Sequence, residues 1–295
     1  MNRDQMMAQI RGGNGFIAAL DQSGGSTPKA LGAYGVADDA WSSDDEMFAL
    51  IHEMRSRIIK SPSFGGGKIL GAILFEKTMD GDVDGTPVPD ALKERGIVPF
   101  IKVDQGLADE QDGVQLMKPL DKLDALLEKS VAKGMFGTKM RSVINHADED
   151  GIRAIVDQQM EVANRILDAG LVPIVEPEVN IKSESRAEAD GLLLSELMRA
   201  LAGLEGNREI MLKLSLPVQD DLFAPLVAHD RVARVVALSG GYSREEAVDK
   251  LERNRGMIAS FSRALLEELR HGMSDDEFDS ALGRAIAEIA RASAT

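Results

Sequence analysis

The segment from Glu209 to Pro217, EIMLKLSLP, has the composition of a buried β-strand that carries one buried charge, Lys213. Leu212 and Leu214 flank this lysine in an otherwise apolar run. Removing an ammonium group from water is costly unless the group is paired or loses its proton. A fold that keeps Lys213 here must compensate for its charge, which makes this lysine the first candidate for a chemical role.

Segments with strand character alternate with helical segments along the whole chain. Strict alternation predicts parallel strands, and eight of them favour a closed (β/α)8 TIM barrel of the α/β class over an open doubly wound sheet. The open sheet is also disfavoured because no GxGxxG turn follows the first strand. We expect a single domain over residues 1–295, with a C-terminal helical tail over 264–295. The predicted strands lie near 16–21, 67–76, 97–104, 135–143, 171–179, 209–216, 232–239 and 257–262.

The charge balance limits the classes of partner. The chain has 49 acidic and 34 basic residues and a net charge of -15, which disfavours nucleic acid and anionic membranes. An anionic substrate must therefore meet a local cluster of Lys and Arg. The sequence has no cysteine, and its longest apolar runs are too short to span a bilayer. We expect a cytoplasmic protein without a membrane or nucleic-acid partner.

Charged side chains occupy the ends of several predicted strands, which is where barrel enzymes carry their chemistry. Residues two apart on a strand point the same way, so pairs at this spacing share a face. A single charge at a strand end is more often a solvated rim residue, and the glutamates could also serve only as structural ion-pair partners of the lysines. The ring of acids and bases consists of Asp21, Lys102, Asp104, Lys139, Arg141, Glu176, Glu178 and Lys213.

Such a ring suits imine chemistry. A neutral lysine attacks ketones and forms an imine, which then acts as an electron sink. The ammonium of Lys139 would favour a neutral Lys213, because like charges repel. A carboxylic acid must protonate the departing hydroxyl, and two carboxyls whose pKa values repulsion pushes apart can supply one acid and one base. Glu176 and Glu178 are the candidates for that pair.

The segment LSGGYSREE, residues 238–246, has the features of a phosphate-binding loop. Gly240 and Gly241 follow the seventh strand, where bare backbone N–H groups can approach an anion. Ser243 and Glu246 match a capping box for the next helix. Arg263 follows the eighth strand, and the loops after strands seven and eight are the usual phosphate site of this fold. A plain glycine turn is the alternative, and the nearby arginine favours phosphate.

The histidines give no sign of a metal site. They are scattered and show no HxH or HExxH spacing. We expect no metal and no other cofactor, with the covalent chemistry carried by Lys213 alone.

Together these strands resemble a known family. The sequence resembles the class I (Schiff-base) fructose-bisphosphate aldolases, in the family's order, from residue 20 to residue 265. The matching segments are LDQSGGS (20–26), GAILFEKTMDG (71–81), FIKVDQG (100–106), TKMR (138–141), VPIVEPEV (172–179), LKLS (212–215), LSGGYSREEA (238–247) and ASFSRAL (259–265).

The resemblance implies a metal-independent lyase of glycolysis or gluconeogenesis. It would reversibly cleave fructose 1,6-bisphosphate to dihydroxyacetone phosphate and glyceraldehyde 3-phosphate. Lys213 would form the imine with C2 of the ketose, and Glu176 would be the general acid that dehydrates the carbinolamine. Lys139 and Glu178 would position and tune the site, and Asp21 would take the C4 hydroxyl proton as the C3–C4 bond breaks.

The resemblance also implies contacts to both ends of the substrate. The C1-phosphate pocket would be made by Ser239, Gly240, Gly241, Ser260 and Arg263. The other end would be lined by Ser23, Ser26, Lys29, Lys102 and Arg141.

The chain departs from the family's animal members at three places. They have Arg after the residue that matches Lys29, where this chain has Ala30, and they have Glu where it has Gln22. Their C-terminal tyrosine, which handles the C3 proton of the enamine, has no match in the final residues ARASAT. Tyr242, a carboxylate or water is expected to take that step.

Two alternative functions stay open. One is a Schiff-base aldolase for a related ketose phosphate such as tagatose bisphosphate, and the other is a sugar-phosphate-binding barrel without catalysis that acts as a sensor or scaffold. In each case the expected partners are small sugar phosphates, and a homo-oligomer is compatible with the sequence.

Overall fold

The computed structural model describes residues 1–65 and 67–295, and its main sheet contains eight parallel strands that follow one another around a barrel. Each strand pairs in parallel with the next. The Ala19 N–H donates to the Phe261 carbonyl at 3.1 Å, which joins the last strand to the first. The predicted (β/α)8 barrel is confirmed. Its strands are β1 (Phe16–Leu20), β2 (Ile69–Leu74), β5 (Val98–Lys102), β7 (Gly137–Ile144), β8 (Val172–Val179), β9 (Ile210–Ser215), β10 (Val232–Leu238) and β11 (Ile258–Ala259).

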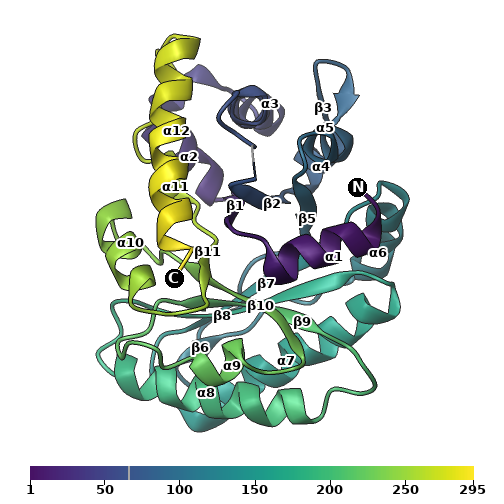
Figure 1. The fold of residues 1–295 in the computed structure, drawn as a ribbon, viewed down its shortest axis with the longest axis vertical. Coiled ribbons are helices and arrows are strands. Elements are labelled where there is room, and N and C mark those ends of the chain that lie inside the picture. Colours follow the sequence, from purple (N-terminus) through teal and green to yellow (C-terminus); the bar gives the residue numbers. More distant parts are fainter. Residues whose placement is uncertain (66) are drawn as a thin grey trace.

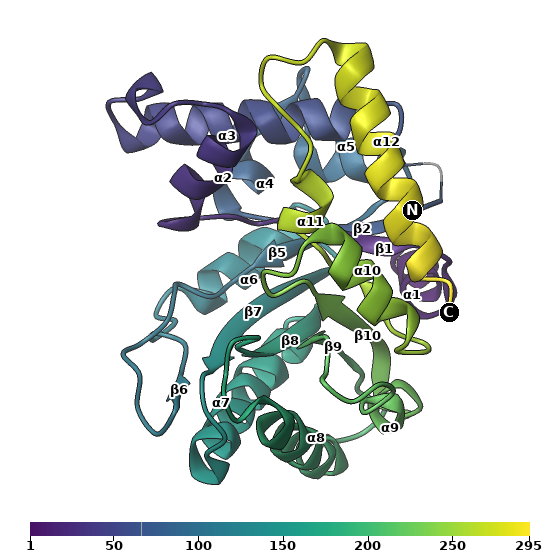
Figure 2. The ribbon, with the colours of Figure 1, turned by 90° about the vertical axis from the view of Figure 1, so that its left-hand side faces the viewer.

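Helices surround the barrel, and Figures 1 and 2 show them outside the strands. The N-terminal half carries α1 (Arg3–Gly12), α2 (Ser26–Tyr34), α3 (Asp44–Lys60), α4 (Glu76–Asp80), α5 (Val88–Glu94) and α6 (Leu123–Ala132). The C-terminal half carries α7 (Glu149–Asp168), α8 (Arg186–Ala202), α9 (Ala224–Val227), α10 (Arg244–Glu252), α11 (Arg263–Leu266) and α12 (Asp275–Ala292). Short additional elements are η1 (Asp38–Ala40), β3 (Asp82–Val83), β4 (Thr86–Pro87) and β6 (Val114–Gln115).

The barrel interior changes from apolar to charged along the strands. Ile17, Ile174 and Met211 belong to one buried apolar cluster inside the barrel. Side chains two residues apart on a strand share a face, so Glu176 and Lys213 continue the interior rows of Ile174 and Met211. The side chains that point into the barrel are therefore apolar in the middle of the strands and charged at their carboxyl ends.

Helix α1 lies against the opposite end of the barrel. Met6 and Ile10 pack into the interior cluster. The Gln9 side-chain amide donates to the carbonyls of Leu70 and Gly96, next to the amino ends of β2 and β5, at 2.8 and 2.7 Å. With this end covered by apolar side chains, the carboxyl ends are left as the mouth of the barrel.

The last strand is shorter than predicted, and the C-terminal tail contains two helices. Strand β11 has two residues instead of the expected 257–262, although the Ser260 N–H still donates to the Ala237 carbonyl at 2.7 Å. The expected C-terminal helical tail over about 264–295 consists of two helices, α11 and α12. Ser274 and Glu277 form a capping box that starts α12 anew, because they satisfy the first free N–H groups of that helix.

No helix in the described part of the chain is long and apolar enough to cross a membrane.

Candidate active site

Four of the predicted catalytic side chains meet at the mouth of the barrel. The Lys139 ammonium lies 2.9 Å from Asp21 Oδ2 and 2.7 Å from Glu176 Oε2. The Lys213 ammonium lies 3.1 Å from Glu176 Oε1. Glu176 thus contacts a different lysine with each oxygen, and the groups come from β7, β8, β9 and the end of β1. The sequence showed only which side chains share a face of their own strand. The barrel places these faces next to one another.

This cluster is almost wholly removed from solvent. Lys139 and Lys213 are each 4% exposed and Glu176 is 3% exposed. Burial opposes the ammonium of Lys139, but attraction to Asp21, Glu176 and Asp104 outweighs it and raises the pKa of Lys139. Burial likewise opposes the carboxylate of Glu176, yet Lys139, Lys213 and Arg141 lower its pKa. Burial also opposes the carboxylate of Asp21, but Lys139 and Lys213 hold its pKa below the ordinary value. Lys139 therefore stays an ammonium beside Lys213.

Glu178 does not pair with Glu176 as expected. Its Oε2 accepts a hydrogen bond from Arg141 Nε at 2.5 Å. The two carboxyls expected to supply one acid and one base thus have different cationic partners, since Glu178 binds Arg141 and Glu176 contacts Lys139 and Lys213.

A second polar group lies beside this cluster. Lys102 Nζ donates to Ser23 Oγ at 2.7 Å and lies 3.2 Å from Asp104 Oδ1. Ser26 Oγ donates to the Ser23 carbonyl at 2.8 Å and accepts from the Ser23 N–H. Lys29 is an exposed residue on α2, the helix that Ser26 begins. The structure thus joins Ser23, Ser26 and Lys102 at the loop after β1, whereas Arg141, predicted for the same end of the substrate, lies on β7 with Glu178 as its partner.

The predicted phosphate residues lie at the ends of β10 and β11. Gly240 has φ 61° and Gly241 has φ 117°, backbone conformations that side chains rarely adopt. A Cβ on Gly241 would lie 3.4 Å from a guanidinium nitrogen of Arg263, so the arginine reaches this loop. Ser239 and Ser260 are buried, and Ser260 Oγ has no hydrogen-bond partner in the described chain. Backbone donors, a free hydroxyl and an exposed guanidinium form a set that suits an anion.

Tyr242, which the sequence offered for the C3 proton, lies beside this loop. It is half-buried, and the Lys250 ammonium lies 5.0 Å from the centre of its ring. Nothing in these contacts connects its hydroxyl with the lysine cluster.

Two buried residues behind the site escaped the sequence analysis. Gln159 on α7 accepts a hydrogen bond from the Glu176 N–H through Oε1 at 2.8 Å, and Arg55 on α3 donates to the Gln22 carbonyl at 2.5 Å. The sequence contained an indication of both. Gln159 lies four residues after Ile155, and Arg55 lies four residues after Ile51, so each falls on the apolar stripe of its helix. A polar residue in such a stripe is buried and needs a partner.

No group of three or more His, Asp or Glu side chains that could hold a metal ion occurs in residues 1–65 and 67–295.

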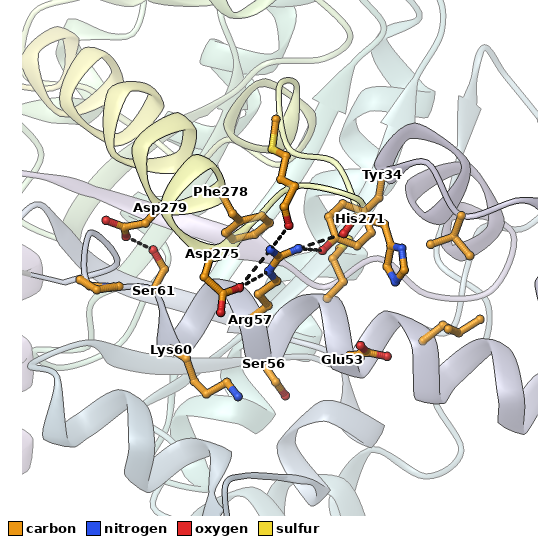
Figure 3. A pocket seen from close by; sticks show the side chains of 15 residues that line it. Tyr34, Glu53, Ser56, Arg57, Lys60, Ser61, His271, Asp275, Phe278 and Asp279 are labelled. Carbon is orange, nitrogen blue, oxygen red and sulfur yellow. Dashed lines mark hydrogen bonds and ion pairs between the residues drawn. The ribbon is translucent and has the colours of Figure 1, made fainter.

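A cavity of about 480 Å³ lies away from the barrel mouth, between α3 and residues 271–279 (Figure 3). None of the predicted site residues lines it. Its central guanidinium, Arg57, is bonded to Tyr34, Asp275 and backbone carbonyls, so its donors are used within the protein. This cavity is therefore separate from the predicted catalytic side chains at the barrel mouth.

Comparisons with known proteins agree with the geometry. The family model described as class-I fructose-bisphosphate aldolase matches residues 4–202, a segment that includes Asp21, Lys139 and Glu176 and ends before β9. The fold is similar to that of fructose-bisphosphate aldolase from Plasmodium falciparum, solved with TRAP and a small-molecule inhibitor. The TM-score is 0.81 at 21% identity, over 99% of this chain and 94% of that one. A structure from Corynebacterium glutamicum has a TM-score of 0.54 at 14% identity, over 98% and 92% of the two chains.

Proposed function

The chain belongs to the class-I fructose-bisphosphate aldolase family, whose members are lyases that use a lysine Schiff base, and on this basis we propose its substrate and site residues. The proposed reaction is the reversible cleavage of fructose 1,6-bisphosphate to dihydroxyacetone phosphate and glyceraldehyde 3-phosphate. Lys213 carries the imine in this proposal. The protonated imine is itself the electron sink, so the chemistry needs no metal.

The contact between Lys213 and Glu176 carries the proposal. The two groups are buried and lie 3.1 Å apart, within reach of a direct proton transfer. One transfer from the ammonium to the carboxylate produces a neutral amine and a carboxylic acid, which are the nucleophile and the acid that imine formation requires. A substrate that displaces water favours this neutral pair, because burial penalises both charged forms. Glu176 Oε1 faces Lys213 and would take this proton, while Glu176 Oε2 keeps its contact with the Lys139 ammonium at 2.7 Å.

The steps then follow from the positions of the groups. The Lys213 amine adds to the C2 carbonyl, and Glu176 gives its proton to the C2 hydroxyl, which leaves as water. Asp21 takes the proton of the C4 hydroxyl, the C3–C4 bond breaks, and its electrons move into the protonated imine. The aldehyde product leaves, Asp21 returns its proton to water, and C3 of the enamine takes a proton from water. Hydrolysis of the imine then releases dihydroxyacetone phosphate and the Lys213 amine. Lys139 remains an ammonium between Asp21 and Glu176 and holds both carboxylates in place.

The local charge suits a substrate with a phosphate at each end. Although the chain has a net charge of -15, cations outnumber carboxylates at the mouth. The loops after β10 and β11 would hold the C1 phosphate, and the loop after β1 would hold the other end. The cations are Lys102, Lys139, Arg141, Lys213 and Arg263, and the carboxylates are Asp21, Asp104, Glu176 and Glu178.

A coupled assay of the purified chain tests the substrate. We expect fructose 1,6-bisphosphate to be cleaved with a higher kcat/KM than tagatose 1,6-bisphosphate, and the rate to survive dialysis against EDTA. A higher kcat/KM for the tagatose compound would assign the chain to the other ketose. Loss of activity in EDTA that added divalent metal restores would contradict the imine mechanism, and binding of both sugars without cleavage would indicate a non-catalytic barrel.

A further inference from the structure

Helix α3 buries an arginine that has no carboxylate partner. Arg55 is 1% exposed, and no Asp or Glu oxygen in residues 1–65 and 67–295 makes a salt bridge with it. A buried guanidinium without a counterion costs free energy, and an apolar side chain of similar size would be cheaper. Burial lowers the pKa of Arg55 to about 10, against the opposing pull of the Asp21 carboxylate, so the group stays charged at neutral pH.

The donors of Arg55 are directed to the loop that follows β1. Its NH2 group donates to the Gln22 carbonyl at 2.5 Å and lies 3.2 Å from Gln22 Oε1, while NH1 donates to Thr78 Oγ1 at 2.7 Å. Gln22 Nε2 in turn donates to Ser262 Oγ at 2.6 Å. Gln22 stands between Asp21 and Ser23, and Ser262 directly precedes Arg263. One guanidinium is thus linked, directly and through Gln22, to the neighbouring loops that follow β1 and β11.

A neighbouring arginine on the same helix has a different environment. Arg57 lies two residues further, about 200° around the helix, so it points away from the barrel mouth. It pairs with Asp275, stacks 4.3 Å from the centre of the Phe278 ring, and lines the cavity of Figure 3. Arg57 ties α3 to the segment before α12, with a carboxylate partner. The two residues therefore form a natural comparison.

We propose that Arg55 is a positioning residue for the carbon–carbon cleavage step, because it fixes the loop that carries Asp21 and Ser23 and, through Gln22, links that loop to the segment of Arg263. The inference rests on the proposed function. A carbonyl and an amide oxygen accept the bonds of Arg55, so the guanidinium orients the loop without neutralising Asp21. Only cleavage needs Asp21, whereas imine formation needs Lys213 and Glu176. Loss of Arg55 should therefore separate the two steps.

The test compares Arg55→Met with Arg57→Met in the full chain. Each variant is assayed for cleavage of fructose 1,6-bisphosphate and for borohydride trapping with dihydroxyacetone phosphate. For Arg55→Met we expect kcat of cleavage to fall on the order of 100-fold, as for a misplacement of about 1 Å, while the rate of trapping stays near that of the wild type. For Arg57→Met we expect a lower Tm and no such separation. Gln22→Met, which keeps the buried guanidinium but cuts the link to Ser262, should fall between the two.

The outcomes are distinguishable. If Arg55→Met and Gln22→Met lose cleavage and trapping in equal proportion, or behave like Arg57→Met, Arg55 is only structural and the inference is overturned. If the wild type itself gives no adduct on Lys213, the proposed function fails instead. Should Arg55→Met not fold, Gln22→Met carries the same comparison, and an unchanged ratio of cleavage to trapping in that variant contradicts the proposal.

Discussion

Glu176 contacts both Lys213 and Lys139, and these two contacts suggest different roles for Glu176 and Asp21. Its Oε1 faces Lys213 and its Oε2 faces Lys139, while Asp21 touches only Lys139 among these lysines. The proton that leaves Lys213 therefore has Glu176 as its direct acceptor. Asp21 lies on the other side of Lys139, where it can serve a different proton.

At the residue scale, we predict that Glu176→Gln and Asp21→Asn fail at different steps. Glu176→Gln should slow imine formation with dihydroxyacetone phosphate by about 10²- to 10⁴-fold, the usual contribution of a general acid. Asp21→Asn should abolish cleavage of fructose 1,6-bisphosphate but leave imine trapping largely intact. Rapid-quench borohydride trapping and a coupled cleavage assay measure the two steps. Equal losses of both steps in both variants would contradict this division.

The candidate residues Lys213, Glu176 and Glu178 could be predicted from the sequence because the alternation of side chains along a strand depends only on neighbouring residues. Lys213 stood out as a charge between two leucines, and pairs such as Glu176 and Glu178 share a face at a spacing of two. Which carboxylate meets which lysine depends on the stagger of neighbouring strands, which the sequence does not show. That is why Glu178 was expected beside Glu176, whereas it binds Arg141. Arg55 was missed because its partner Gln22 lies on a distant loop.

At the scale of elements, the contact between α7 and β8 fixes the backbone of the acid. Gln159 is fully buried and accepts the Glu176 N–H, and the following residue, Pro177, has no N–H of its own. The helix thus satisfies the N–H donor of Glu176, the residue that we propose as the acid. A change in the packing of α7 against β8 would therefore shift the backbone of Glu176.

We predict that Gln159→Leu lowers both stability and activity. An unpaired buried N–H costs about 1–3 kcal/mol of unfolding free energy, and a shifted Glu176 should slow imine formation. The adjacent Gln158→Leu is the matched control, since Gln158 bonds both backbone groups of Met117 instead of β8. Urea unfolding and trapping rates are the measurements. If Gln158→Leu slows trapping as much as Gln159→Leu, the α7–β8 contact has no special role.

The elements themselves were predictable where their apolar pattern is long. The barrel strands β1, β2, β5, β8, β9 and β10 lie within their predicted segments and β7 extends one residue beyond its own, because buried parallel strands are continuous apolar runs. The short β11 and the division between α11 and α12 depend on ladder partners and on the capping box at Ser274. The length of β11 and the start of α12 depend on tertiary contacts and on single residues. Apolar periodicity alone therefore predicts a longer strand and gives no boundary between the two helices.

At the scale of the molecule, the buried cluster links stability to pH. The pKa values of Asp21 and Glu176 lie below their ordinary values of 3.8 and 4.5, so their contribution is present above those values and is lost as pH falls through the lower folded pKa values. The pKa of Lys139 is raised above 10.5, so its contribution is present below that value and is lost as pH rises through the higher folded pKa. All three groups therefore stay charged across the neutral range.

We predict that Lys139→Met lowers the unfolding free energy by about 3–5 kcal/mol, because it leaves two buried carboxylates without their shared partner. Between about pH 5 and pH 10 the difference from the wild type should be constant, and it should shrink as the carboxyls become protonated in acid. Urea unfolding at a series of pH values measures it. A difference that grows in acid would have the wrong sign for this cluster.

The central claim is an imine on Lys213, and borohydride reduction tests it most directly. The chain is incubated with dihydroxyacetone phosphate, reduced with sodium borohydride, digested and mapped by mass spectrometry. Lys139, equally buried and in contact with the same glutamate, is the internal control. We predict a reduced triose phosphate adduct on Lys213, none on Lys139, and none in Lys213→Met. The absence of an adduct on Lys213, or an adduct on another lysine, would contradict the mechanism.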